Sequence, residues 1–314
     1  MRRPLADRVL LPLARAVAAS ALATMLSGCP PTLAPPASLR VVTTPFPGPK
    51  DFAGGFDPAA RPAADGGQST YEGALFVAML DSKLVAAVLP AGLELAKPLA
   101  VTADHPVLLL VGNQRNPLEL RGGATYPIPL SNDYREAMLL VPFVVRTAGN
   151  QRWHTYVVRM YLDDVRPVAI GNTIFGYEKV LAILAESGAF PNVKTNVRDF
   201  ASTLLFESDV QTTGPWQASA AATGVPRWAD FQTIFEMPIV GTLPFVGFVC
   251  SYWEWHYAST EVAPATSRFR FAQPFRPSMS DWVALGTLTN APGGALVVRG
   301  LRWRLALWPP GCQF

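Results

Sequence analysis

The sequence predicts an α+β fold that is mainly β, with a few short helices and either a large antiparallel or mixed sheet or a closed β-barrel. Half of the 314 residues are hydrophobic and only 16% are charged, a balance typical of folded rather than disordered chains. The 30 prolines and 24 glycines favour many turns and short elements. Between these breaks the apolar residues come in short runs rich in Val, Leu, Tyr and Phe, which strands prefer.

The clearest strands are EAMLLVPFVVR, residues 136–146, and HTYVVRMYLD, residues 154–163. Pro142 within the first of them indicates a bulge or a sheet edge. The best local helix signal is YEKVLAILAES, residues 177–187, with Gly188 as its stop. Other expected elements are a short helix or turn at 83–89 and strands at 72–80, 98–103, 106–112, 201–208, 269–274 and 295–308.

The N-terminus predicts export. Residues 1–28 begin with basic residues, continue into the apolar run AVAASALATML and end in Leu-Ser-Gly before Cys29. Leu-Ser-Gly-Cys resembles the lipobox of bacterial lipoproteins. The resemblance implies a cleaved signal peptide over 1–28 and a lipid on Cys29, which would anchor the protein to a membrane of the bacterial cell envelope. In a Gram-negative cell, that is the periplasmic face of the outer membrane. The alternative is a plain N-terminal helix in which Cys29 is an incidental thiol.

The rest of the chain divides into a tether and one domain. Residues 29–68 are rich in Pro, Ala and Gly, which predicts a tether stiffened by proline, and residues 69–314 form the domain. Cys250 and Cys312 either pair in the oxidising compartment that export implies or remain two buried thiols.

Several function classes have no support. A formal net charge of +3 gives no electrostatic case for a nucleic-acid partner, and three histidines make a histidine-rich metal site improbable. Nucleotide-binding glycine motifs, HExxH and paired CxxC motifs are absent, so we expect no cofactor. In SYWEWHY, residues 251–257, alternation places Trp253, Trp255 and Tyr257 on one strand face. That face is either aromatic core, with Glu254 outside, or the lining of a ligand pocket that holds Glu254.

A lysine in an apolar stretch carries the main functional signal. MYLDDVRPVAIGNTIFGYEKVLA, residues 160–182, resembles the segment around the Schiff-base lysine of the acetoacetate decarboxylase family, with matches at 160–163, Gly171, Tyr177 and Lys179. Upstream, Tyr134-Arg135-Glu136 resembles a Tyr-x-Glu element whose glutamate lies in that family's active site. The resemblance covers about residues 71–185. It implies a fold of the same type, with Lys179 as nucleophile and Glu136 as acid/base or orienting group. Tyr134, Phe175 and Tyr177 would then line the substrate site.

The chain also departs from the family pattern. Asn172 and Thr173 replace an Arg-Glu pair, Glu178 replaces a proline, and Val180 replaces a second lysine. The family's substrate-binding arginine falls on about Tyr71, and a second active-site acid maps near Ala103. A carboxylate-binding cation would have to come from elsewhere, for example from Arg135, Arg159 or Arg166.

Two main hypotheses follow. In the first, the envelope lipoprotein is a Schiff-base carbon–carbon lyase that acts on a keto acid or a related carbonyl compound. Its lysine pKa, ordinarily about 10.4, must fall by desolvation for the amine to be neutral. In the alternative, the same cavity binds an apolar or carbonyl ligand without catalysis. A structural envelope protein that has lost its pocket is a third interpretation, and a homo-oligomer is compatible with each.

Overall fold

The computed structural model describes residues 67–96, 103–119, 128–129, 133–148, 152–274 and 276–307. The predicted signal peptide, Cys29 and nearly all of the predicted tether lie outside these residues. So do Cys312 and most of the strand expected at 98–103. Cys250 is disulfide-bonded, and its partner cysteine also lies outside the described part. Within the described residues, no helix is long and apolar enough to cross a membrane.

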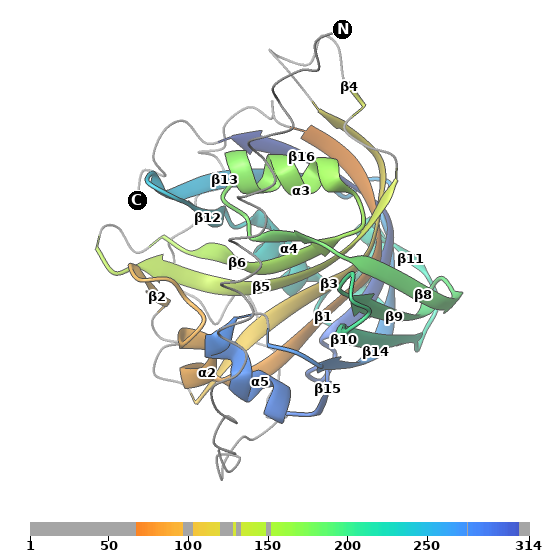
Figure 1. Ribbon diagram of the computed structural model, residues 1–314. Coiled ribbons are helices and arrows are strands. Elements are labelled where there is room, and N and C mark those ends of the chain that lie inside the picture. Colours follow the sequence, from red (N-terminus) through yellow and green to blue (C-terminus); the bar gives the residue numbers. More distant parts are fainter. Residues whose placement is uncertain are drawn as a thin grey trace, which may run out of the picture. The chain divides into compact units, whose positions relative to one another are not determined.

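Seven strands pair in a closed circuit (Figure 1). In spatial order they are β1 (Gly67–Asp81), β3 (Asp104–Glu119), β5 (Tyr134–Arg146), β6 (His154–Leu162), β12 (Ile239–Leu243), β13 (Gly247–His256) and β16 (Ala295–Leu307). Neighbours are antiparallel except β6 and β12, and β1 pairs with both β3 and β16. The prediction of a mainly β, α+β fold with a large mixed sheet is therefore confirmed.

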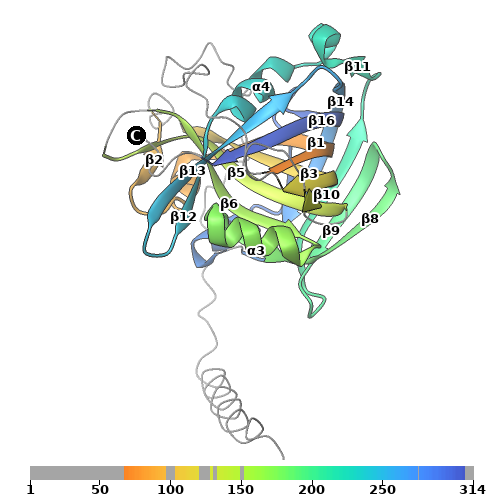
Figure 2. The same cartoon turned by 90° about the horizontal axis from the view of Figure 1, so that it is seen from above.

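Further strands extend the sheet from β16. They are β14 (Glu261–Phe271), β10 (Leu204–Thr212), β9 (Asn192–Arg198) and β8 (Ile183–Ala189), joined in that order. Short strands are added at β2 (Leu93–Leu95), β4 (Ile128–Pro129), β7 (Lys179–Leu181), β11 (Gln217–Ala218) and β15 (Thr287–Thr289). Among the described residues, the helices are α2 (Ser82–Ala86), α3 (Val165–Ile174), α4 (Trp228–Glu236) and α5 (Ser280–Ala284), with 3-10 turns at Ser219–Gly224 and Pro277–Met279. Helix α3 packs beside β6 and β7, and α4 beside β13 (Figure 2).

Both faces of the central strands are buried, because successive side chains point to opposite sides. Leu75, Leu110 and Met138 belong to one hydrophobic cluster, which also contains Trp253 and Trp303 and which we call the first cluster. The alternate positions, such as Phe76, Leu109 and Leu139, belong to a second cluster on the other face. This explains why the strands appear in the sequence as nearly continuous apolar runs.

Two local expectations are confirmed. The pairing of β5 with β6 shifts register between Val141 and Val144, so Pro142 does mark a bulge. Trp253 and Trp255 lie in the first cluster and Tyr257 packs against it, whereas Glu254 lies on the other face and pairs with His256. The aromatic stretch is therefore core, and Glu254 is not enclosed by it.

The helix expected at 177–187 is wrong. The helix lies upstream, at Val165–Ile174, where the Asp164 side chain accepts from the Arg166 N–H and caps the first turn. Gly176, with a φ of 62°, follows the helix end in a left-handed conformation that favours glycine. Residues 179–181 then pair in parallel with Met160–Leu162, so Lys179 lies on a strand.

Candidate active site

Lys179 is held in place by the connection between α3 and β7. The Asn172 side chain makes two hydrogen bonds to the backbone of Lys179. Its Oδ1 accepts from the Lys179 N–H at 2.7 Å, and its Nδ2 donates to the Lys179 carbonyl at 2.8 Å. Val180 packs against the second cluster, so alternation directs Lys179 toward the first cluster. Asn172, which replaces the expected arginine, therefore positions the lysine strand.

Gly171 provides the space through which the lysine side chain passes. A Cβ at this buried position would overlap Cδ and Cε of Lys179 and lie 3.0 Å from Nζ. The methylenes of Lys179 thus occupy the volume that any other residue at 171 would fill. This gives a steric reason for Gly171, which is one of the positions where the segment resembles the acetoacetate decarboxylase family.

The Lys179 amine is held away from water. Burial lowers its pKa to about 8, and the negative charge of Glu136 acts in the opposite direction. Nζ lies 5.9 Å from the centre of the Tyr177 ring. At pH 7, about a tenth of an amine with this pKa is uncharged and nucleophilic, and the fraction rises with pH.

Glu136 is a buried acid whose charge acts on the lysine. It is 1% exposed, and burial raises its pKa to about 7, while the charge of Lys179 and a hydrogen bond from Gln114 oppose that rise. Gln114 Nε2 donates to Glu136 Oε1 at 2.6 Å, and Trp303 Nε1 donates to Gln114 Oε1 at 2.8 Å. The carboxyl group is therefore oriented by a chain of two donors from β3 and β16.

Gln114 and Trp303 were missed from the sequence. Gln114 lies on the same face of β3 as Leu108 and Leu110, which belong to the first cluster. A polar residue on an otherwise apolar strand face was the one sequence signal that could have indicated a role in the site. Its partner is 189 residues away along the chain, which no local pattern reveals.

No family model and no curated protein matches the sequence. Solved structures do resemble it. The enduracididine biosynthesis enzyme MppR, complexed with pyruvate, aligns with a TM-score of 0.52 at 12% identity over 85% of this chain and 96% of its own. The acetoacetate decarboxylase of Legionella pneumophila aligns with a TM-score of 0.50 at 15% identity over 79% and 92%. An acetoacetate decarboxylase-like enzyme from Sphingomonas wittichii RW1 aligns with a TM-score of 0.51 at 14% identity over 82% and 96%.

The chain has an acetoacetate decarboxylase-like fold. At these identities the likeness shows the fold alone, so the chemistry of this acetoacetate decarboxylase-like domain has to be argued from its own residues. Tyr71, at the position expected for the family's arginine, is fully buried. Burial and the charge of Glu136 raise its pKa well above the usual value of 10, and they act in the same way on Tyr134. Both rings therefore stay neutral, and neither replaces the missing positive charge.

Glu178 belongs to a different set of contacts from Lys179. Its carboxylate forms ion pairs with Arg159 and with Arg276, whose Nε donates at 2.7 Å. Arg276 also donates to the Tyr156 hydroxyl at 2.9 Å. Two guanidinium groups thus neutralise Glu178, and the carboxylate next to Lys179 in the sequence does not stabilise the lysine's ammonium form.

The three arginines considered as carboxylate-binding cations are paired with acids. Arg135 Nε lies 2.8 Å from Asp163 Oδ2, and Arg166 Nη2 lies 3.5 Å from Asp164 Oδ2. Arg159 forms its ion pair with Glu178. The structure therefore gives no support to the expectation that one of these three arginines binds a substrate carboxylate.

An apolar cavity is present near Tyr177, but it is small, and neither Lys179 nor Glu136 is among its lining residues. It has a volume of about 20 Å³, roughly what one water molecule needs, and its lining includes Tyr177, Trp253 and Trp255. The Tyr177 hydroxyl bonds the Ser251 hydroxyl and accepts from Trp253 Nε1 at 3.3 Å, and the Phe175 ring stacks on Tyr177 at 5.5 Å. Of the predicted substrate-binding residues, Tyr177 lines this cavity, Phe175 packs against Tyr177, and buried Tyr134 lies near Glu136.

Proposed function

We propose that the protein is an envelope lipoprotein whose acetoacetate decarboxylase-like domain forms a Schiff base between Lys179 and a carbonyl compound. The observation that supports this most directly is a buried amine with a pKa of about 8 beside a buried carboxyl group with a pKa of about 7. Near neutral pH such a pair supplies both a nucleophile and a proton donor.

The proposed steps use these two groups. The neutral amine of Lys179 attacks the carbonyl carbon, and a C–N bond forms to give a carbinolamine. Glu136 donates its proton to the departing hydroxyl, so water leaves and an iminium remains. In a β-hydroxy ketone, the Glu136 carboxylate takes the hydroxyl proton while the C–C bond breaks and its electron pair enters the iminium. Glu136 then returns that proton to the enamine carbon, and water releases the product from Lys179.

The charges around the site favour a substrate without a carboxylate. A keto acid would bring its negative charge close to Glu136, and the arginines that might balance it are paired with Asp163, Asp164 and Glu178. An uncharged ketone or aldehyde avoids the desolvation of an unpaired anion, which is expensive in a buried site. Among the carbonyl compounds considered, we therefore favour neutral ones over keto acids.

Borohydride trapping tests this proposal. The full chain is incubated with diacetone alcohol or with acetoacetate and reduced, and its peptides are weighed by mass spectrometry. We expect an adduct on Lys179, more from the neutral ketone than from the keto acid, and none in Lys179→Met. Lys194, an exposed lysine on β9, is the internal control. No adduct with either compound, or labelling of Lys179 no greater than that of Lys194, would contradict Schiff-base formation.

A second candidate function is ligand binding without turnover. The small, aromatic-lined cavity of about 20 Å³ favours it, because neither Lys179 nor Glu136 lines this cavity and a larger ligand would enter only if the side chains around it moved. Saturable binding of an apolar ligand without a borohydride adduct would support this alternative. Release of acetone from diacetone alcohol would support the lyase.

The envelope location rests on residues 1–29 and is tested separately. We expect the mature N-terminus to be a diacylated or triacylated Cys29, detected by mass spectrometry after expression in a bacterium. Cys29→Ser should remove the lipid. In a detergent phase-partition experiment, the variant should then stay in the aqueous phase. A lipidated Cys29→Ser protein, or a mature chain that still carries residues 1–28, would refute the anchor.

A further inference from the structure

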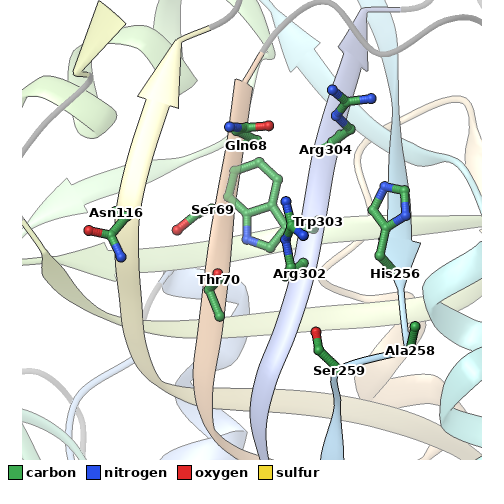
Figure 3. A pocket seen from close by; sticks show the side chains of 10 residues that line it. All are labelled: Gln68, Ser69, Thr70, Asn116, His256, Ala258, Ser259, Arg302, Trp303 and Arg304. Atoms are coloured by element: carbon green, nitrogen blue, oxygen red, sulfur yellow. The ribbon is translucent and has the colours of Figure 1, made fainter. Parts of the chain in front are cut away.

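A second, polar pocket lies on the sheet surface, apart from the candidate active site. It has a volume of about 620 Å³ and is formed by β1, β3, β16 and the turn that follows β13 (Figure 3). It shares no lining residue with the apolar cavity near Tyr177. Of the residues that line it, Trp303 also takes part in the Schiff-base site, where it donates to Gln114 and so helps to orient Glu136.

Two arginines give this pocket its charge. Arg302 and Arg304 stand two residues apart on β16, so they share a face of the strand at a spacing of about 7 Å. In the register of the sheet, Arg302 lies opposite Thr70 on one side and His256 on the other. The cationic and hydroxyl groups of three adjacent strands therefore meet on one surface (Figure 3).

No carboxylate neutralises these arginines within the described residues. Other arginines of the surrounding sheet do have partners: Arg299 pairs with Glu261 at 2.7 Å, and Arg115 with Glu72 at 3.2 Å. Glu254 stands opposite Arg304 in the register, but its carboxylate contacts His256 at 3.2 Å instead. The pocket thus carries two guanidinium groups that have no ion pair with a described acid.

We propose that this pocket binds a phosphate ester. Guanidinium groups bind phosphate oxygens with paired, charge-assisted hydrogen bonds, and two of them at this spacing can contact one phosphate group from both sides. Thr70 adds a hydroxyl donor, and the volume is larger than a bare phosphate requires.

The same chemistry has two sources, a soluble phosphate ester and a phospholipid headgroup. The pocket includes Gln68, Ser69 and Thr70, the residues that directly follow or end the predicted tether. If Cys29 carries a lipid, the tether links this part of the chain to a membrane, so a headgroup is one of the two sources to be tested.

The test uses the full chain carrying Cys29→Ser, so that no lipid anchor contributes. Calorimetry measures binding of glycerol 3-phosphate, and sedimentation compares phosphatidylglycerol with phosphatidylcholine vesicles. We expect Arg302→Gln and Arg304→Gln each to weaken binding at least about tenfold, the equivalent of about 1.4 kcal/mol. Arg268→Gln is the matched control, because Arg268 is an exposed arginine on β14 outside the pocket.

Each outcome decides the proposal. Arginine-dependent binding of glycerol 3-phosphate supports it with a soluble ligand, and arginine-dependent binding confined to phosphatidylglycerol vesicles supports it with a headgroup. Absence of both kinds of binding overturns it. So does equal weakening by Arg268→Gln, because the effect would then reflect net charge alone.

Discussion

Replacing Gly171 with alanine is expected to abolish Schiff-base trapping at Lys179 while leaving the domain folded. The new Cβ would occupy the space that Cδ and Cε of Lys179 fill. Because those atoms belong to a flexible side chain, the lysine can leave its position, and its amine then moves toward solvent. We expect its pKa to return toward 10.5 and the yield of borohydride adduct near neutral pH to fall at least about tenfold.

The stability of Gly171→Ala separates this mechanism from unfolding. Alanine is favoured over glycine in a helix by about 1 kcal/mol, and releasing a buried ammonium removes a further cost. We therefore expect a free energy of unfolding equal to or above that of the original protein in urea titrations. Gly224→Ala is the control, since a Cβ there would meet only the Gln217 amide, at 3.1 Å. Trapping at the original yield in Gly171→Ala would show that the lysine does not depend on this space.

The strands were predictable because their signal is local. β5 and β6 carry continuous runs of Val, Leu and Tyr that bury both faces, and composition alone separates such runs from loops. The helix expected at 177–187 failed for a related reason. Val180, Leu181, Ile183 and Leu184 have a spacing that suits a helix face as well as two short strands. Residues 179–181 form a strand because they pair with β6, and the sequence of residues 177–187 contains no information about that partner.

The site was predictable only in part. Lys179 and Glu136 were predicted through their resemblance to known motifs, and in the structure the charge of each shifts the pKa of the other. Gln114 has no motif, because its role depends on the pairing of β3 with β5 and on Trp303 from the last strand. The role of Asn172 was equally hidden, since it acts on the backbone of Lys179 rather than on a ligand.

Replacing Lys179 with methionine is expected to stabilise the domain near pH 6.5 and to lose that advantage as the pH rises. The pKa of Lys179 is about 8 in the folded state, below its ordinary value of 10.5. The unfolded chain therefore binds the proton more tightly, and the buried ammonium destabilises the fold below pH 8. The cost disappears as the pH rises from about 8 to 10.5, where both states become neutral. A methionine has no such charge and fills a similar volume.

One pKa unit corresponds to about 1.36 kcal/mol. The Lys179 amine is buried but part of the residue remains exposed, so we expect a gain of about 2 kcal/mol near pH 6.5, less than the full shift would give. Urea titrations of both proteins from about pH 6.5 to 10 measure the difference, and Lys194→Met controls for loss of a surface charge. When Lys179→Met is made in a Glu136→Gln protein, the gain should be larger than in the original protein above about pH 7, where charged Glu136 raises the lysine pKa. If the difference in free energy of unfolding stays constant with pH, or if the original protein is the more stable one near pH 6.5, the amine is exposed to water.

A lysine kept at this energetic cost, in a fold that is more stable without it, is expected if the amine is retained for its reactivity.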